Sequence, residues 1–215
     1  MIRTEKVTNI DSNTVVLHGA VDEVGNPAYF ERGFAISSNT SLPTIKDEKV
    51  IVSGDGPGNF DCEYSGFSTE KSIYVRAYAI NHKGVAYGES FILFDPNIIH
   101  CGDYIKVLSV NIAVQMSDAG SGNQKTLSHL CTSSNVGGFN DWRLPTIGEL
   151  TSLYGLRDQI GGFKEKDKYC VYWSCSPGSF GDGEHWLVFD FFKGQQNDVY
   201  YNNSAFLGRC VRSLK

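Results

Sequence analysis

The sequence has no long apolar run and no cluster of positive charge. No stretch approaches the roughly 18 consecutive apolar residues that a membrane-spanning helix needs. Lys and Arg number 19 against 24 Asp and Glu, so the net charge is −5, and the basic residues form no runs. Because phosphate contacts need clustered Lys and Arg, we expect neither nucleic acid nor a membrane surface as a partner.

The N-terminus lacks the charged segment and the apolar segment of a signal peptide. Strand-like sequence begins almost at once, at residues 6–10. A cytosolic location is the simplest interpretation of this N-terminus. We prefer a mature exported protein to which Met1 was added, located at the cell surface or secreted, because of the domain types that the rest of the sequence indicates.

The cysteines lack the spacing of a zinc site, since the sequence contains neither a close CxxC pair nor an HxxxH motif. We expect no metal and no other cofactor. The sequence by itself leaves the pairing open among six cysteines: Cys62, Cys101, Cys131, Cys170, Cys175 and Cys210.

Residues 4–94 consist of short apolar and β-branched segments separated by turns. Expected strands cover 14–21, 29–37, 49–53, 60–64, 72–81 and 85–94. In the segment 72–81, alternate residues face opposite sides of a sheet. Roughly seven strands with turns every 8 to 12 residues are typical of an all-β, immunoglobulin-like sandwich.

Three strings in this half carry a more specific resemblance: Glu31-Arg32-Gly33-Phe34, Tyr74 to Asn81, and Ala86-Tyr87-Gly88. Together they resemble the fibronectin type III-like repeats of surface proteins from Gram-negative gut anaerobes. Asp95-Pro96-Asn97 interrupts the last strand. We therefore expect a sandwich over residues 1–95 and a second domain over residues 96–215.

The second half mixes strands with two helices. We expect one strand over 104–116, a helix with Leu127, Leu130 and Cys131 on its buried face, and later strands over 169–174, 184–192, 199–201 and 206–211. The second helix begins at Thr146, which forms a capping box with Glu149. This pattern predicts an α+β domain.

The string from Gly138 to Thr146, Gly-Phe-Asn-Asp-Trp-Arg-Leu-Pro-Thr, is the sharpest motif. Tyr172-Trp173-Ser174 and Arg209-Cys210-Val211-Arg212 follow it at a distance. The succession resembles the "WRLPT" domain of the Fibrobacter major-paralogue type, a C-type-lectin-like module of bacterial surface proteins. The resemblance implies a disulfide between Cys131 and Cys210.

We interpret the residues of this motif as structural rather than ligand-binding: Trp142, Arg143, Pro145, Thr146 and Glu149. Trp142 precedes a capped helix, where it can pack beneath the first turn, and its N–H then needs one buried acceptor. Asn140-Asp141 has the wrong order and position for the calcium site of sugar-binding lectins. A calcium ion at 118–123 or 182–184 remains an alternative.

The expected ligand surface is the late segment, 176–185 and 195–206, which is rich in Tyr, Asn, Ser and Gly. Tyr offers a large contact area at low entropy cost, and Asn and Ser offer adaptable hydrogen bonds. The alternative is a solvated loop. The candidate ligand-binding residues are Phe180, Asp182, His185, Tyr200, Tyr201, Asn202 and Asn203.

An enzymatic function finds little support, because the five His residues are scattered and none lies in a recognisable Ser or Cys triad setting. The lectin-like fold includes the formylglycine-generating enzymes, so Cys170 and Cys175 leave a cysteine oxidase as a minor alternative. We expect a non-enzymatic adhesion protein whose sandwich is a spacer and whose lectin-like domain binds a glycan or protein on another cell or in the host matrix. A lipid anchor on the full-length protein would provide attachment. The alternative is a structural subunit of a surface or fimbrial assembly.

Overall fold

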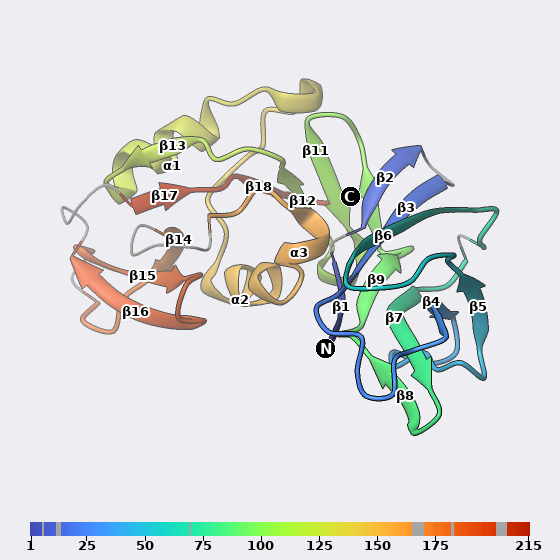
Figure 1. The fold of residues 1–215 in the computed structure, drawn as a ribbon. Helices are drawn as coiled ribbons and strands as arrows, with labels where there is room; N and C mark the ends of the chain where they lie inside the picture. Colours follow the sequence, from blue (N-terminus) through green and yellow to red (C-terminus); the bar gives the residue numbers. More distant parts are fainter. Residues whose placement is uncertain (6, 12–13, 69, 165–169, 182, 201–205) are drawn as a thin grey trace. The chain divides into compact units, whose positions relative to one another are not determined.

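A computed structural model describes residues 1–215 except 6, 12–13, 69, 165–169, 182 and 201–205 (Figure 1). The chain divides into two compact units, which we call unit 1 (Met1–Pro96) and unit 2 (Asn97–Lys215). Both are built largely from antiparallel strands. Each unit is described by itself.

Unit 1 is all β in its described part. Its strands are β1 (Ile2–Thr4), β2 (Thr8–Asp11), β3 (Thr14–Val21), β4 (Glu31–Ser37), β5 (Glu48–Ile51), β6 (Gly58–Ser65), β7 (Ile73–Asn81), β8 (Gly84–Tyr87) and β9 (Phe91–Phe94). In one sheet, β3 pairs with β6 along one edge and with β1 and β2 along the other. The second sheet has the order β5-β4-β7, and both β8 and β9 pair with β7.

The two sheets of unit 1 share one apolar core. Leu17 of β3 and Phe60 of β6 belong to the same buried cluster as Phe34 of β4 and Val75 of β7. The rings of Phe34 and Phe60 lie 5.1 Å apart between centroids. Alternation along the strands therefore buries one face of each sheet against the other.

The expected single strand over 85–94 is two strands, β8 and β9. The break falls at Gly88, where a Cβ atom would lie 2.4 Å from the backbone nitrogen of Thr4. Thr4 belongs to β1, and its hydroxyl accepts a hydrogen bond from Ala77 N at 2.9 Å. Only a glycine allows this approach of β1, and the expected strand over 85–94 is interrupted at this position.

Unit 2 contains two sheets and three α-helices in its described part. The first sheet has the order β10 (Ile98–His100), β11 (Tyr104–Val107), β12 (Ile112–Gln115), β18 (Val211–Ser213). The second has the order β13 (Gly120–Gly122), β17 (Phe206–Gly208), β14 (Val171–Pro177), β15 (His185–Asp190), β16 (Gln195–Tyr200). The helices are α1 (Gln124–Thr132), α2 (Ile147–Gly155) and α3 (Arg157–Ile160).

The second sheet of unit 2 separates two apolar clusters. Tyr172 and its cross-strand partner Phe189 pack with Leu150 of α2. The next pair, Trp173 and Val188, packs on the opposite face with α1. Each face of the sheet is thus covered by one helix, and β16 ends the sheet on the side away from β17 (Figure 1).

Three expectations about unit 2 were wrong in detail. The segment 104–116 is a hairpin, because a 3₁₀ turn at Leu108–Val110 and a left-handed residue, Asn111 (φ 58°), reverse the chain between β11 and β12. The segment 206–211 is divided between β17 and β18, which belong to different sheets. Leu130 is 41% exposed, since the buried face of α1 is formed by Gln124, Leu127 and Cys131.

Candidate functional site

The motif around Trp142 forms a rigid scaffold. Trp142 is 1% exposed, and its indole N–H donates to the carbonyl of Val136 at 3.0 Å. The backbone of Arg143 exchanges two hydrogen bonds with Val211. The carbonyl of Pro145 accepts from Cys175 N at 2.8 Å. These contacts fix the start of α2 to the last strand and to β14.

Arg143 and Glu149 form a two-pronged ion pair at this helix start. Both guanidinium NH groups lie 2.8 Å from the carboxylate oxygens of Glu149. The capping box is complete, with Thr146 Oγ1 accepting from Glu149 N and Glu149 accepting from Thr146 N. Burial raises the pKa of Glu149, but hydrogen bonds from Arg143 and Thr146 outweigh it and hold that pKa below its usual value.

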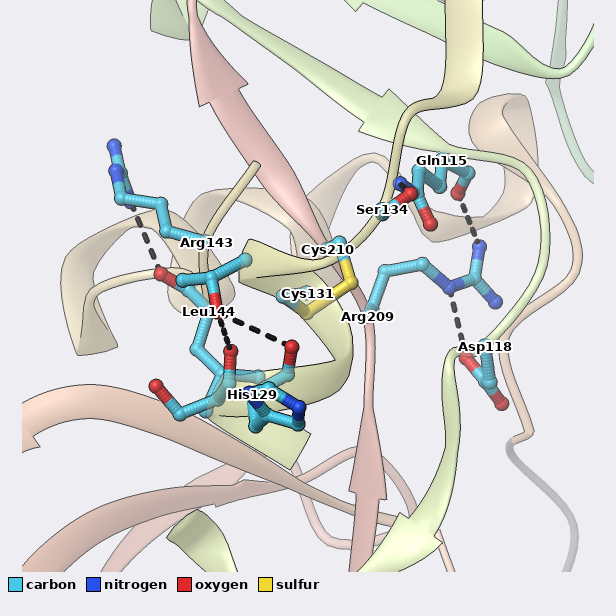
Figure 2. The surroundings of a disulfide bond; sticks show 11 residues. Gln115, Asp118, His129, Cys131, Ser134, Arg143, Leu144, Arg209 and Cys210 are labelled. Atoms are coloured by element: carbon cyan, nitrogen blue, oxygen red, sulfur yellow. Dashed lines mark hydrogen bonds and ion pairs between the residues drawn. A yellow bond between two sulfur atoms is a disulfide. The ribbon is translucent and has the colours of Figure 1, made fainter. Parts of the chain in front are cut away.

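The disulfide between Cys131 and Cys210 is present, as the resemblance implied. Figure 2 shows it joining α1 to the segment between β17 and β18, with Arg209 beside it. Arg209 is fully buried and donates to Asp118 Oδ1 at 2.8 Å and to the carbonyls of Gln115 and Met116 at 3.1 Å. The disulfide and this guanidinium therefore hold the loop after β12 against the end of the chain.

Neither alternative calcium position gains support from the described contacts. Both oxygens of Asp118 accept hydrogen bonds, from Arg209 and from the hydroxyl of Tyr172. Asp182 lies outside the described residues. Across the described part of the chain, no three His, Cys, Asp or Glu side chains are grouped as a metal site would require.

The structure brings together three of the seven expected ligand-binding residues. Phe180, His185 and Tyr200 form a contiguous series of rings, which we call the aromatic row. The ring centroids of Phe180 and His185 lie 4.4 Å apart, and those of His185 and Tyr200 lie 5.6 Å apart. The other four, Asp182, Tyr201, Asn202 and Asn203, lie outside the described residues.

Local structure explains why these rings meet. His185 and Tyr200 are direct cross-strand partners in β15 and β16, so their side chains share one face of the sheet. Phe180 comes from the loop after β14. Phe180 is 72% exposed and Tyr200 is 37% exposed, so the row presents apolar area to solvent.

A fourth residue of this region, Asp198, was missed from the sequence. It lies two residues before Tyr200 in β16, and its Oδ2 accepts a hydrogen bond from Ser179 N at 2.6 Å. The sequence reads Gln-Gln-Asn-Asp before Val199, which lacks the apolar alternation that indicates a strand. Asp198 is placed beside the aromatic row by the pairing register of β16 with β15, which the local sequence does not reveal.

The cysteine pair of the minor enzymatic alternative is divided between two environments. Cys170 is completely buried just before β14, whereas Cys175 is a partly buried thiol within β14. Burial raises the pKa of the Cys175 thiol, although the neighbouring Arg143 guanidinium opposes the change. A raised pKa keeps the thiol protonated and therefore weakly nucleophilic.

A hydroxyl–imidazole–carboxylate series that sequence reasoning did not find lies on unit 1. Thr8 Oγ1 is 2.9 Å from His18 Nε2, and His18 Nδ1 is 2.7 Å from Asp61 Oδ1. The three residues belong to the adjacent strands β2, β3 and β6. We interpret the series as cross-strand hydrogen bonding on an outer sheet face, because a triad also needs donors placed for an oxyanion.

Comparison with known proteins places unit 2 in context. Residues 109–212 match the family model described as the Lcl C-terminal domain, a surface-associated and lectin-like family of domains. No curated protein and no solved structure matches the chain. None of the helices in the described part is long and apolar enough to cross a membrane.

Proposed function

We propose that the chain is a non-enzymatic cell-surface binding protein whose recognition site is the aromatic row of unit 2. The observation that carries the proposal is the placement of Phe180, His185 and Tyr200 side by side at the exposed end of the β15–β16 hairpin. Exposed clustered aromatic rings on a rigid strand pair are characteristic of recognition surfaces. The match of residues 109–212 to a surface-associated domain family supports the same conclusion.

Unit 1 would act as a spacer of the fibronectin type III-like class. Its two sheets, with β1, β2, β3 and β6 in one and β4, β5, β7, β8 and β9 in the other, support this assignment. Unit 2 would be a C-type-lectin-like recognition head. Support comes from the two helices on opposite faces of its sheet and from the Cys131–Cys210 bond between the first helix and the last strands.

The proposed location is the cell surface or the surrounding medium. A disulfide that links α1 to the C-terminal segment is typical of proteins that fold in an oxidising compartment. The partner would be a glycan or a protein on another cell or in the host matrix. Binding would need no metal or other cofactor, and attachment would come from a lipid anchor on the full-length protein.

The experiment is a glycan and protein array probed with the chain and three variants. Phe180→Ala and Tyr200→Ala remove rings of the aromatic row without touching the core. Phe192→Ala is the matched control, because Phe192 is 58% exposed at the opposite end of the same hairpin. We expect hits that both row variants lose and the control keeps. Hits that survive both row variants would refute the site.

A structural subunit of a surface assembly is the second candidate function. The observation in its favour is β16, which in the described part of the chain pairs only with β15 and ends its sheet. A strand edge of this kind can accept a strand of another subunit. Capture of a neighbouring surface subunit, together with an array that yields no hit, would favour this function over ligand binding.

A further inference from the structure

Asp198 lies on the same face of the sheet as the aromatic row. His185 pairs with Tyr200 and Leu187 pairs with Asp198, so all four side chains point to one side of the β15–β16 hairpin. Asp198 is therefore the diagonal neighbour of His185. The Asp198 carboxylate therefore lies beside the rings of the aromatic row.

Gly178 brings the loop after β14 down onto this carboxylate. A Cβ atom at position 178 would lie 2.3 Å from Asp198 Oδ1 and 2.8 Å from His185 Cβ. The backbone of Gly178 also donates to the carbonyl of His185 at 2.7 Å. With the loop held in this way, Ser179 N reaches Asp198 Oδ2 and the ring of Phe180 reaches His185.

The negative charge of Asp198 is weakly compensated. Oδ1 is shielded from solvent and has no hydrogen-bond partner among the described residues, while Oδ2 accepts from Ser179 N. No Lys or Arg takes part in the described contacts of Asp198. An ionised carboxylate without a cationic partner contributes a negative potential to the neighbouring surface.

From this arrangement we infer that the aromatic row takes an uncharged, hydroxyl-rich glycan, and that Asp198 excludes anionic glycans. The inference rests on the proposed function and specifies its ligand class. The negative faces of aromatic rings attract the weakly positive C–H surface of a pyranose ring. The same faces and the Asp198 carboxylate both repel sulfate and carboxylate groups.

The same geometry disfavours a cationic peptide as the ligand. An ion pair at a partly buried site is favourable only when the two charges meet directly with good hydrogen-bond geometry. Oδ1 of Asp198 is shielded and Oδ2 already accepts from Ser179 N, so a lysine ammonium would find only one remaining acceptor position, on Oδ2. A neutral pyranose needs no such contact.

The test uses the full chain and matched polysaccharide probes in affinity electrophoresis at physiological salt. The probes are a neutral galactomannan, a neutral β-glucan, and the same two polymers with their C6 hydroxyls oxidised to carboxylates. We expect retardation by at least one neutral polymer, and at least about fivefold weaker retardation by its oxidised form. Phe180→Ala and Tyr200→Ala should abolish retardation, and Phe192→Ala should leave it unchanged.

Asp198→Asn separates charge from shape, since the amide oxygen can still accept the Ser179 N–H. In this variant we expect the oxidised polymer to regain most of the lost affinity while the neutral polymer keeps its own. Equal binding of both forms by the unmodified chain, or no gain in Asp198→Asn, would overturn the role of Asp198.

The outcomes also separate this inference from the proposed function. Binding of the oxidised polymers that depends on Phe180 and Tyr200 would contradict the ligand class and leave the site intact. Failure of every polysaccharide would overturn the glycan class, and protein hits on the array would then decide the proposed function. Binding of a neutral polymer that is unchanged in both Phe180→Ala and Tyr200→Ala would overturn the aromatic row as the binding site.

Discussion

Arg209 shows how a single buried charge organises unit 2. Its side chain is completely buried, yet its guanidinium donates to Asp118, to the carbonyls of Gln115 and Met116, and to the carbonyl of Gly162. Phe163 lies against the same guanidinium, 4.2 Å from its ring centroid. Removal of one partner of such a network leaves the other polar groups buried without a partner.

Replacing Arg209 with Ala should lower the free energy of unfolding of unit 2 by about 3–5 kcal/mol, the range for one partner of a buried pair. Arg209→Lys should recover only part of the loss, because a lysine cannot serve the same fork of acceptors. Urea unfolding followed by tryptophan fluorescence measures both. Lys193→Ala breaks an ion pair with Asp190 whose lysine side chain is 60% exposed, lies in the same unit as the tryptophans and serves as the control, with little expected change. Equal effects of Arg209→Ala and Lys193→Ala would contradict this role.

The Cys131–Cys210 bond closes a loop with a sequence separation of 79. On the chain-entropy account, loss of such a crosslink removes up to about 4 kcal/mol of stability. The double variant Cys131→Ala/Cys210→Ala should therefore unfold at a lower urea midpoint. A reducing agent should lower the midpoint of the unmodified chain and leave that of the double variant unchanged. A midpoint that responds to reduction in both proteins would assign the effect to other cysteines.

The residues of the candidate site were only partly predictable. Phe180, His185 and Tyr200 were predicted as candidate ligand-binding residues from their type and from their place in a loop-rich segment, and the structure brings their rings together. Asp198 and Gly178 were not, because their importance depends on strand register and on how closely a loop approaches a carboxylate. A local sequence pattern shows neither the cross-strand register of Asp198 nor the approach of Gly178 to its carboxylate.

Helix α2 illustrates what local sequence determines well at the scale of an element. Thr146 and Glu149 stand three residues apart before an apolar stripe, and the structure contains both hydrogen bonds of the capping box. Capping depends on neighbours in sequence, so the pattern is sufficient. The bond from Arg143 to Glu149 adds a link to the last strand that no local rule includes.

The Glu149 carboxylate should make the stability of unit 2 depend on pH. Its pKa is held below the usual value of about 4.3, so its stabilisation is complete above that value and is lost as the pH falls through the lower folded pKa. Thermal unfolding from pH 6 to pH 2.5 should show a smaller acid-side loss in Glu149→Gln than in the unmodified chain. If the melting temperature depended on pH identically in the two proteins, the pKa of Glu149 would be the same in the folded and unfolded chain, which would contradict this prediction. Glu149→Gln should also be less stable at pH 6.

Strand β16 shows where element prediction from sequence fails. Its first residues are Gln, Gln, Asn and Asp, which are poor strand formers, and the expected strand began only at Val199. Six consecutive pairs with β15 hold it in place. In β16, pairing with β15 overrides the intrinsic strand propensity of the residues. The segment 104–116 departs from the expected single strand for a local reason, because Asn111 adopts a left-handed conformation and the chain reverses into a hairpin.

The whole molecule has separate cores in its two units. One buried cluster lies wholly in unit 1 and two lie wholly in unit 2. The change in sequence texture and Asp95-Pro96-Asn97 predicted a domain boundary between residues 95 and 96, and the compact units divide the chain between Pro96 and Asn97. Which helix covers which face of the second sheet in unit 2 was beyond sequence reasoning, since that depends on long-range packing.

Separate cores predict two unfolding transitions. In calorimetry of the full chain, reduction of the Cys131–Cys210 bond should lower the transition of unit 2 and leave that of unit 1 in place. Residues 1–96 and 97–215, produced separately, should each show one of the two transitions. A single transition that shifts as a whole on reduction would mean that the units unfold as one body.

The most direct test of ligand recognition by the aromatic row is a titration calorimetry comparison on the strongest ligand from the array. The double variant Phe180→Ala/Tyr200→Ala is compared with Phe192→Ala, each in the full chain. The account predicts at least about a tenfold rise in Kd for the double variant, or about 1.4 kcal/mol, with Phe192→Ala unchanged and both thermal transitions preserved. Equal affinities for the two variants would contradict it.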